Sequence, residues 1–156
     1  IDKKLTDSWG IDVSPTFSPD GKNMAFVSKR AGTPQVYIKD LATGEVRRLT
    51  YEGNYNTEPD WSPDGDRIVY SAMNGGQADI CVIGTNGRGL NQLTHDAGSN
   101  ESPSWSPDGT LIVFSSTRSG TAKLYVMTAS GTDQRPLLNM AGEQLLPDWS
   151  PAMADD

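Results

Sequence analysis

The residues best suited to catalysis are sparse in this 156-residue chain and follow no known catalytic pattern. The single histidine, His95, lies in Thr94-His95-Asp96, just past a predicted strand, and the single cysteine is Cys81. The chain contains no Gly-x-Ser-x-Gly elbow, no His-Glu-x-x-His helix motif and no phosphate-binding loop. We therefore expect that the protein is not an enzyme and that His95 lies on a solvated loop. A single thiol gives no indication of the redox compartment.

Carboxylates are the remaining candidates for chemistry. Glu58 and Glu101 fall in neighbouring repeats and could help to hold Ca²⁺ together with carbonyl groups and water. Neither they nor the segment 60–65 has the spacing of oxygen ligands found in calcium loops. We expect no metal and no cofactor, and a negative potential that favours a basic patch or N–H donors on a protein partner.

The overall charge excludes two large classes of partner. Thirteen Lys and Arg against twenty Asp and Glu give a formal net charge of −7 and a pI near 4.6. This sign opposes binding to a phosphate backbone or to an anionic membrane surface. The chain also has no window of about 20 apolar residues that could span a bilayer. We expect no nucleic-acid partner and no direct membrane insertion.

Behind these side chains lies a repeat of 44 residues. An aromatic residue followed by Ser-Pro occurs at Phe17, Trp61, Trp105 and Trp149, and the first three copies continue into Asp-Gly. Within a unit, apolar residues alternate with polar ones in short runs bounded by turn residues, which predicts strands. Units of this length with four strands are typical of β-propeller blades, and the repeated aromatic residues are then inter-blade core.

The predicted fold is all-β, a propeller of four-stranded antiparallel blades in one partial domain spanning 1–156. We expect three full blades at about 13–50, 57–94 and 101–138, with partial strands at about 3–6 and 145–149. Three blades leave apolar faces and strand edges uncovered, so we expect either a longer parent propeller or self-association through the open blade edges.

Several segments resemble the propeller domain of the TolB family of the Tol-Pal system. These segments are the Trp-Ser-Pro-Asp-Gly repeats, Gln35-Val36-Tyr37, Asn56-Thr57-Glu58-Pro59, Lys123-Leu124-Tyr125-Val126-Met127 and Leu146-Pro147-Asp148-Trp149-Ser150-Pro151. The resemblance implies a six-bladed ring of which this chain is the C-terminal half. It also implies a periplasmic, non-enzymatic scaffold that binds the lipoprotein Pal at the propeller mouth and supports outer-membrane integrity and cell division. Binding of TolA is implied only for an N-terminal region that this sequence lacks.

The loops that lead into the innermost strands vary between repeats, whereas the core positions do not. Solvated loops vary in the same way, so variation alone does not establish a contact surface. The resemblance assigns contacts with Pal to these loops. By register, the implied partner-binding residues are Asp12, Val13, Asn56, Thr57, Glu58, Asn100, Glu101, Gln144 and Leu145.

Two other functions are compatible with the repeat. Similar blades form the gating propeller of prolyl-oligopeptidase-like serine peptidases, which continue into a hydrolase domain with a Gly-x-Ser-x-Gly elbow. The final residues 150–156 favour a natural stop over such a continuation. A propeller that binds a carbohydrate or a peptide is the third option, since this fold hosts many functions.

Overall fold

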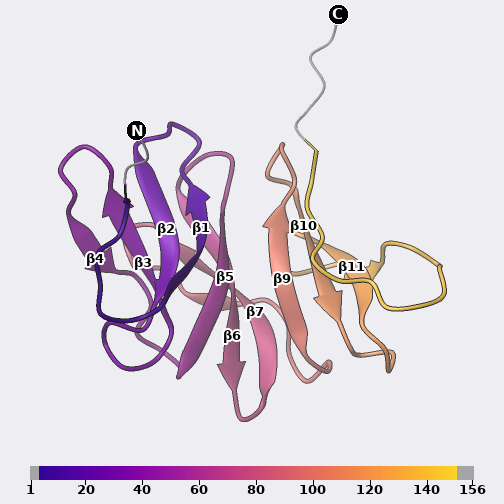
Figure 1. The fold of residues 1–156 in the computed structure, drawn as a ribbon. Helices are drawn as coiled ribbons and strands as arrows, with labels where there is room; N and C mark the ends of the chain where they lie inside the picture. Colours follow the sequence, from indigo (N-terminus) through magenta and orange to yellow (C-terminus); the bar gives the residue numbers. More distant parts are fainter. Residues whose placement is uncertain (1–3, 151–156) are drawn as a thin grey trace, which may run out of the picture.

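The computed structural model describes residues 4–150 and contains three four-stranded antiparallel sheets, side by side in chain order (Figure 1). The all-β, four-stranded blade architecture predicted from the repeat is confirmed. The first blade comprises β1 (Asp12–Phe17), β2 (Asn23–Ser28), β3 (Gln35–Asp40) and β4 (Val46–Arg48). The second comprises β5 (Tyr55–Trp61), β6 (Arg67–Asn74), β7 (Gln77–Gly84) and β8 (Asn91–Gln92). The third comprises β9 (Asn100–Trp105), β10 (Leu111–Ser116), β11 (Lys123–Thr128) and β12 (Arg135–Pro136).

The two expected flanking strands have no strand pairing in the part of the chain that is described. Residues 4–6 and 145–149 run as irregular chain, and residue 3 lies outside the described residues. A strand is defined by the partner it bonds to, and no partner strand for either segment is among residues 4–150. Within those residues there is also no helix that is long and apolar enough to cross a membrane.

The Ser-Pro-Asp-Gly segments close the hairpin between the first two strands of each blade. In the first blade the Ser18 hydroxyl accepts the Asn23 N–H at 2.9 Å and donates to Asp20 at 2.6 Å. Gly21 adopts φ 69°, a left-handed conformation that suits glycine. Ser62 and Ser106 make the equivalent hydrogen bonds in the other blades. The repeated Ser-Pro-Asp-Gly sequence therefore forms the turn of this hairpin in every blade, in line with the predicted turn residues.

Each innermost strand is interrupted by a bulge at the same point of the repeat. The pairing of β1, β5 and β9 with their neighbours shifts register there. The residue at this point has a φ of 51–54° and precedes a proline in every repeat; these residues are Ser14, Glu58, Ser102 and Leu146. A left-handed residue that is not glycine, directly before proline, is a strained conformation. The bulge turns this side chain away from the ordinary alternation of the strand.

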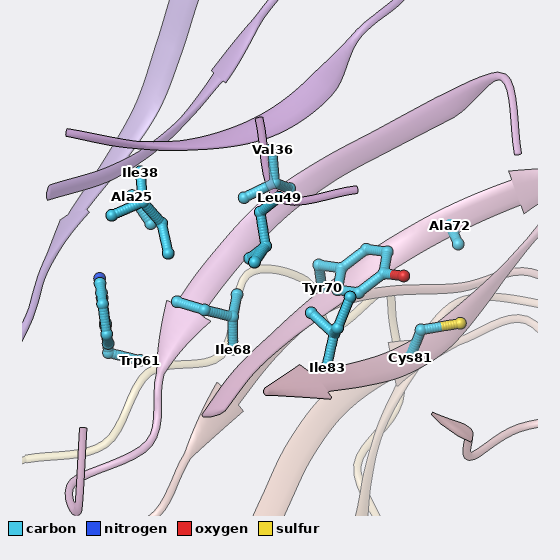
Figure 2. Packing of buried hydrophobic residues seen from close by; sticks show 10 residues of the cluster. All are labelled: Ala25, Val36, Ile38, Leu49, Trp61, Ile68, Tyr70, Ala72, Cys81 and Ile83. Carbon is cyan, nitrogen blue, oxygen red and sulfur yellow. The ribbon is translucent and has the colours of Figure 1, made fainter. Parts of the chain in front are cut away.

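The hydrophobic core lies between blades. One cluster joins the first two blades and includes Ala25, Ile38, Trp61 and Ile68, and Figure 2 shows its side chains extending toward one another from both blades. A second cluster joins blades two and three around Trp105. The Trp61 indole N–H also donates to the Thr16 carbonyl of the preceding blade at 3.3 Å. The tryptophans at 61 and 105 are therefore inter-blade core residues, as predicted.

Among residues 4–150, no other sheet packs on the corresponding face of the first blade. Phe17 occupies the repeat position of Trp61 but is 50% exposed, whereas Trp61 is 8% exposed. A hollow of about 350 Å³ on this face is lined mainly by apolar side chains, among them Val13, Phe17 and Phe26. The same repeat position therefore contributes to stability only where a preceding blade covers it.

We expect Trp61→Ala to lower the free energy of unfolding by about 3–5 kcal/mol, because it removes a buried aromatic side chain. Phe17→Ala at the equivalent open position is expected to cost about 1 kcal/mol or less. Urea denaturation of both variants at low protein concentration measures the difference. Equal losses would show that the open face of the first blade is covered in solution.

Candidate partner-binding mouth

The innermost strands β1, β5 and β9 lie side by side (Figure 1). The segment around Leu146 lines the same groove as these strands. Equivalent residues of four successive repeats line a groove of about 380 Å³ along these strands. We call this the inner groove; it comprises residues 14–16, 58–60, 102–104 and 146–148. Because every repeat contributes the same three positions, the groove is the inner wall that a propeller arrangement requires.

A second hollow lies where the loops enter these strands. It has a volume of about 330 Å³, and we call it the mouth pocket. Its lining residues come from all three blades and are Val13, Ser14, Tyr55, Thr57, Glu58, Ser71, Met73, Ala78 and Glu101. The structure thus brings together four of the predicted contact residues, Val13, Thr57, Glu58 and Glu101.

Glu58 holds two blades together at this pocket. One carboxylate oxygen accepts the Ser102 N–H at 2.7 Å and the Ser71 hydroxyl at 2.9 Å, and the other accepts the Ser102 hydroxyl at 3.1 Å. The left-handed backbone at position 58 aims the side chain at the bulge of the next blade. The sequence identified Glu58 as a surface residue but not as an inter-blade tie.

Asn56 and Asn100 are fully buried, each with 0% exposure. The Asn56 amide donates to Gln35 at 2.8 Å and to the Glu52 carbonyl at 2.7 Å. The Asn100 amide donates to the Gly98 carbonyl at 3.1 Å and to the carboxylate of Asp79 at 3.3 Å. Both side chains fix the rim loops to the preceding blade, and in this arrangement neither is accessible to a partner.

The remaining predicted contact residues do not line the mouth pocket. Asp12 is half-buried and forms an ion pair with Arg30 at 3.5 Å. Burial opposes ionisation of Asp12, but hydrogen bonds led by that with Ser28, together with the Arg30 charge, outweigh it and lower its pKa. Gln144 accepts the Leu124 N–H at 3.1 Å, while Leu145 is exposed.

Asp60 is an inter-blade carboxylate that the sequence reasoning missed. It accepts the Trp105 N–H at 2.8 Å and the Ser104 hydroxyl at 3.2 Å across the inner groove. Burial raises the pKa of Asp60 above its ordinary 3.8, and the nearby charge of Asp148 acts in the same direction. The available signal was the 44-residue spacing that relates Asp60 to Ser104 and Asp148.

Arg30 and Arg118, at equivalent positions of the first and third blades, lie over aromatic rings. The Arg30 guanidinium lies 4.9 Å from the Tyr37 ring centre, and the Arg118 guanidinium lies 4.6 Å from that of Tyr125. Arg118 also donates to the Asn100 side-chain oxygen at 3.0 Å. These arginines cover the aromatic pairs of the outer blades and hold the start of the innermost strand.

The residues with the greatest catalytic potential are poorly placed for it. Cys81 is buried, and burial raises the pKa of its thiol to about 12, so the reactive thiolate is suppressed at neutral pH. His95 is exposed on the loop after β8, as expected. Among residues 4–150, no three His, Cys, Asp or Glu side chains are grouped so that they could hold a metal ion.

These features define a β-propeller repeat protein whose blades are joined by apolar cores and by polar ties along an inner groove. The family model described as the TolB beta propeller domain matches residues 1–153, and the chain belongs to this family.

Individual relatives agree with this assignment. A TolB homolog of Chlorobium luteolum is 62% identical over 47 residues, which are 30% of this chain and 11% of the relative. The Tol-Pal system protein TolB of Helicobacter pylori is 50% identical over 54 residues, 34% of this chain and 13% of the relative. These alignments therefore span only a small part of the curated relatives.

Solved structures extend the similarity over nearly the whole chain. TolB from Acinetobacter baumannii superposes with a TM-score of 0.85 at 32% identity, covering 96% of this chain and 37% of that one. A TolB structure from Agrobacterium tumefaciens, itself named putative, has a TM-score of 0.87 at 27% identity, covering 94% of this chain and 54% of that one. The chain thus corresponds to about half or less of these structures.

Replacing Glu58 by Ala should lower the free energy of unfolding by about 1–3 kcal/mol, because the Ser102 N–H loses its shorter acceptor bond and the Ser71 and Ser102 hydroxyls lose an acceptor inside an inter-blade contact. Glu58→Gln, which retains an acceptor oxygen, is expected to lose less. Urea denaturation provides the measurement, with Glu101→Ala as the exposed control. Matching losses for Glu58→Ala and Glu101→Ala would contradict the inter-blade role of Glu58.

Asp60 should make the protein less stable as the pH rises. Its raised pKa means that the folded state holds a proton that the unfolded state has released, so stability falls between pH 3.8 and the higher folded pKa. Asp60→Asn removes this titrating group. The free energy of unfolding of the variant, relative to that of the original chain, should therefore increase as the pH rises from 3.8 to the folded pKa of Asp60. Urea midpoints at several pH values test this; a pH-independent difference between the two proteins would refute it.

Proposed function

We propose that this chain is part of a non-enzymatic scaffold of the Tol-Pal system and that its mouth pocket contacts the lipoprotein Pal. The observation that carries the proposal is the convergence of Val13, Thr57, Glu58 and Glu101 from three blades on one pocket. A site assembled from several loops on a rigid scaffold is typical of binding surfaces. Asn56 and Asn100 have a supporting role in this proposal, because they fix the loops that carry these contacts.

The proposed location is the periplasm, and the proposed role is support of outer-membrane integrity and cell division through Pal. The chain corresponds to 37% of the Acinetobacter baumannii TolB structure, so the activities of a whole TolB are not all assigned to it. We do not assign TolA binding to these blades. Asp12, Gln144 and Leu145 lie outside the mouth pocket and are proposed only as peripheral contacts.

The alternative function, a gating propeller of a serine peptidase, has some structural support. A prolyl endopeptidase structure superposes with a TM-score of 0.67 at 19% identity and covers 85% of this chain. At this identity the likeness concerns the fold alone. The TolB assignment is favoured because it has both higher structural similarity and local identities of 50–62%.

Calorimetric titration with the soluble domain of Pal tests the proposal. Thr57 is partly exposed in the mouth pocket, so Thr57→Arg should block the contact and weaken binding at least about tenfold. The matched control is Thr43→Arg in the exposed turn after β3. Unchanged affinity with Thr57→Arg would remove the mouth pocket from the Pal interface, and absence of any binding would contradict the proposed function of this chain.

A further inference from the structure

The chemistry of the mouth pocket is asymmetric in charge. Two of its nine lining residues are carboxylates, Glu58 and Glu101, and none is cationic. The Glu58 carboxylate is already engaged by Ser102 and Ser71. Glu101 is exposed, and its carboxylate accepts one hydrogen bond, from the Ser99 hydroxyl at 2.7 Å. An acceptor of net negative charge is therefore available to a ligand at this point.

The same pocket has an apolar wall. Val13, Tyr55 and Met73 line it and are exposed large hydrophobic residues, and Ala78 completes this side. An apolar wall beside an available carboxylate matches a long side chain with an aliphatic stem and a cationic head. A cation held near the Tyr55 ring would gain a further electrostatic attraction to its face.

Elsewhere in the chain, arginine combines contact with aromatic rings and a hydrogen bond to a side-chain oxygen. In the first and third blades, Arg30 and Arg118 place a guanidinium over aromatic rings and donate to the side chain of Asp12 or Asn100. The repeat position of these arginines in the middle blade is Asn74. The middle blade thus has no arginine at this repeat position. The side-chain oxygen of Asn56, equivalent to the acceptor in Asn100, is buried without a partner among residues 4–150.

We propose that the mouth pocket receives one arginine side chain of a protein partner, paired with Glu101 and packed against Tyr55 and Met73. The identity of the partner as Pal rests on the proposed function, but the preference for arginine follows from the pocket. An acidic side chain would meet two carboxylates and no cation. Arginine is favoured over lysine because its planar head both stacks on a ring and binds a carboxylate through two N–H groups.

The first arm of the test uses N-acetyl-L-arginine amide and its neutral citrulline analogue as probes. Binding is followed by NMR shifts of the methyl group of Met73, a residue that lines the pocket. We expect saturable shifts with the arginine amide, at least about fivefold weaker binding to Glu101→Gln, and no change with Glu45→Gln, a carboxylate of the exposed turn between β3 and β4. Equal binding of the two probes, or binding that ignores Glu101→Gln, overturns the arginine pocket.

The second arm uses the soluble domain of Pal and separates the two proposals. Arginine-to-lysine variants of Pal are combined with Glu101→Gln in double-mutant cycles. One arginine that couples to Glu101 by about tenfold, with less coupling at high salt, supports both proposals. Binding of Pal without any such coupling overturns the arginine contact and leaves the Pal scaffold intact. Lack of Pal binding, together with a positive first arm, overturns Pal as the partner and keeps the arginine pocket.

Discussion

No blade of this protein can bury both of its own faces, and this constraint organises the rest of the structure. The buried side chains of Ala25 and Ile38 in one blade pack against Trp61 and Ile68 of the next. Trp61 therefore contributes stability through the preceding blade, where its indole N–H reaches the Thr16 carbonyl 45 residues earlier in the chain. The exposed state of Phe17 shows the same position without that neighbour.

Polar ties along the inner groove add directional specificity to this apolar packing. Glu58 binds the Ser102 N–H, and Asp60 binds the Trp105 N–H, in both cases across a blade boundary. Hydrogen bonds to ionised acceptors are stronger than neutral ones and require closer alignment. These hydrogen bonds are directional and so fix the orientation of one innermost strand against the next, whereas apolar packing is non-directional. The raised pKa of Asp60 reflects the burial that this arrangement demands.

The blade architecture was predictable because it depends on local and periodic signals. Ser18, Pro19 and Gly21 specify a turn by their own chemistry, and their recurrence at a spacing of 44 residues gives the blade. The role of Asn56 was not predictable, since its burial depends on Gln35 of the preceding blade. The position of Arg118 over Tyr125 likewise requires knowledge of how the loop folds back. Contacts across blades carry no short-range signature in the sequence. The repeat register could therefore place the nine predicted contact residues near the rim, but it could not distinguish the four that line the mouth pocket from the five that do not.

The mouth pocket depends on the joints between blades more than on any single blade. Val13, Thr57 and Glu101 reach it from β1, β5 and β9, so its shape is set by the relative rotation of three sheets. Glu58 lines the pocket and also ties the second blade to the third. A change that loosens this tie alters the position of Glu101 even when Glu101 itself is untouched. If the mouth pocket binds a partner as proposed, partner affinity and inter-blade stability are coupled through Glu58, because the geometry of the pocket depends on how firmly the blades are joined.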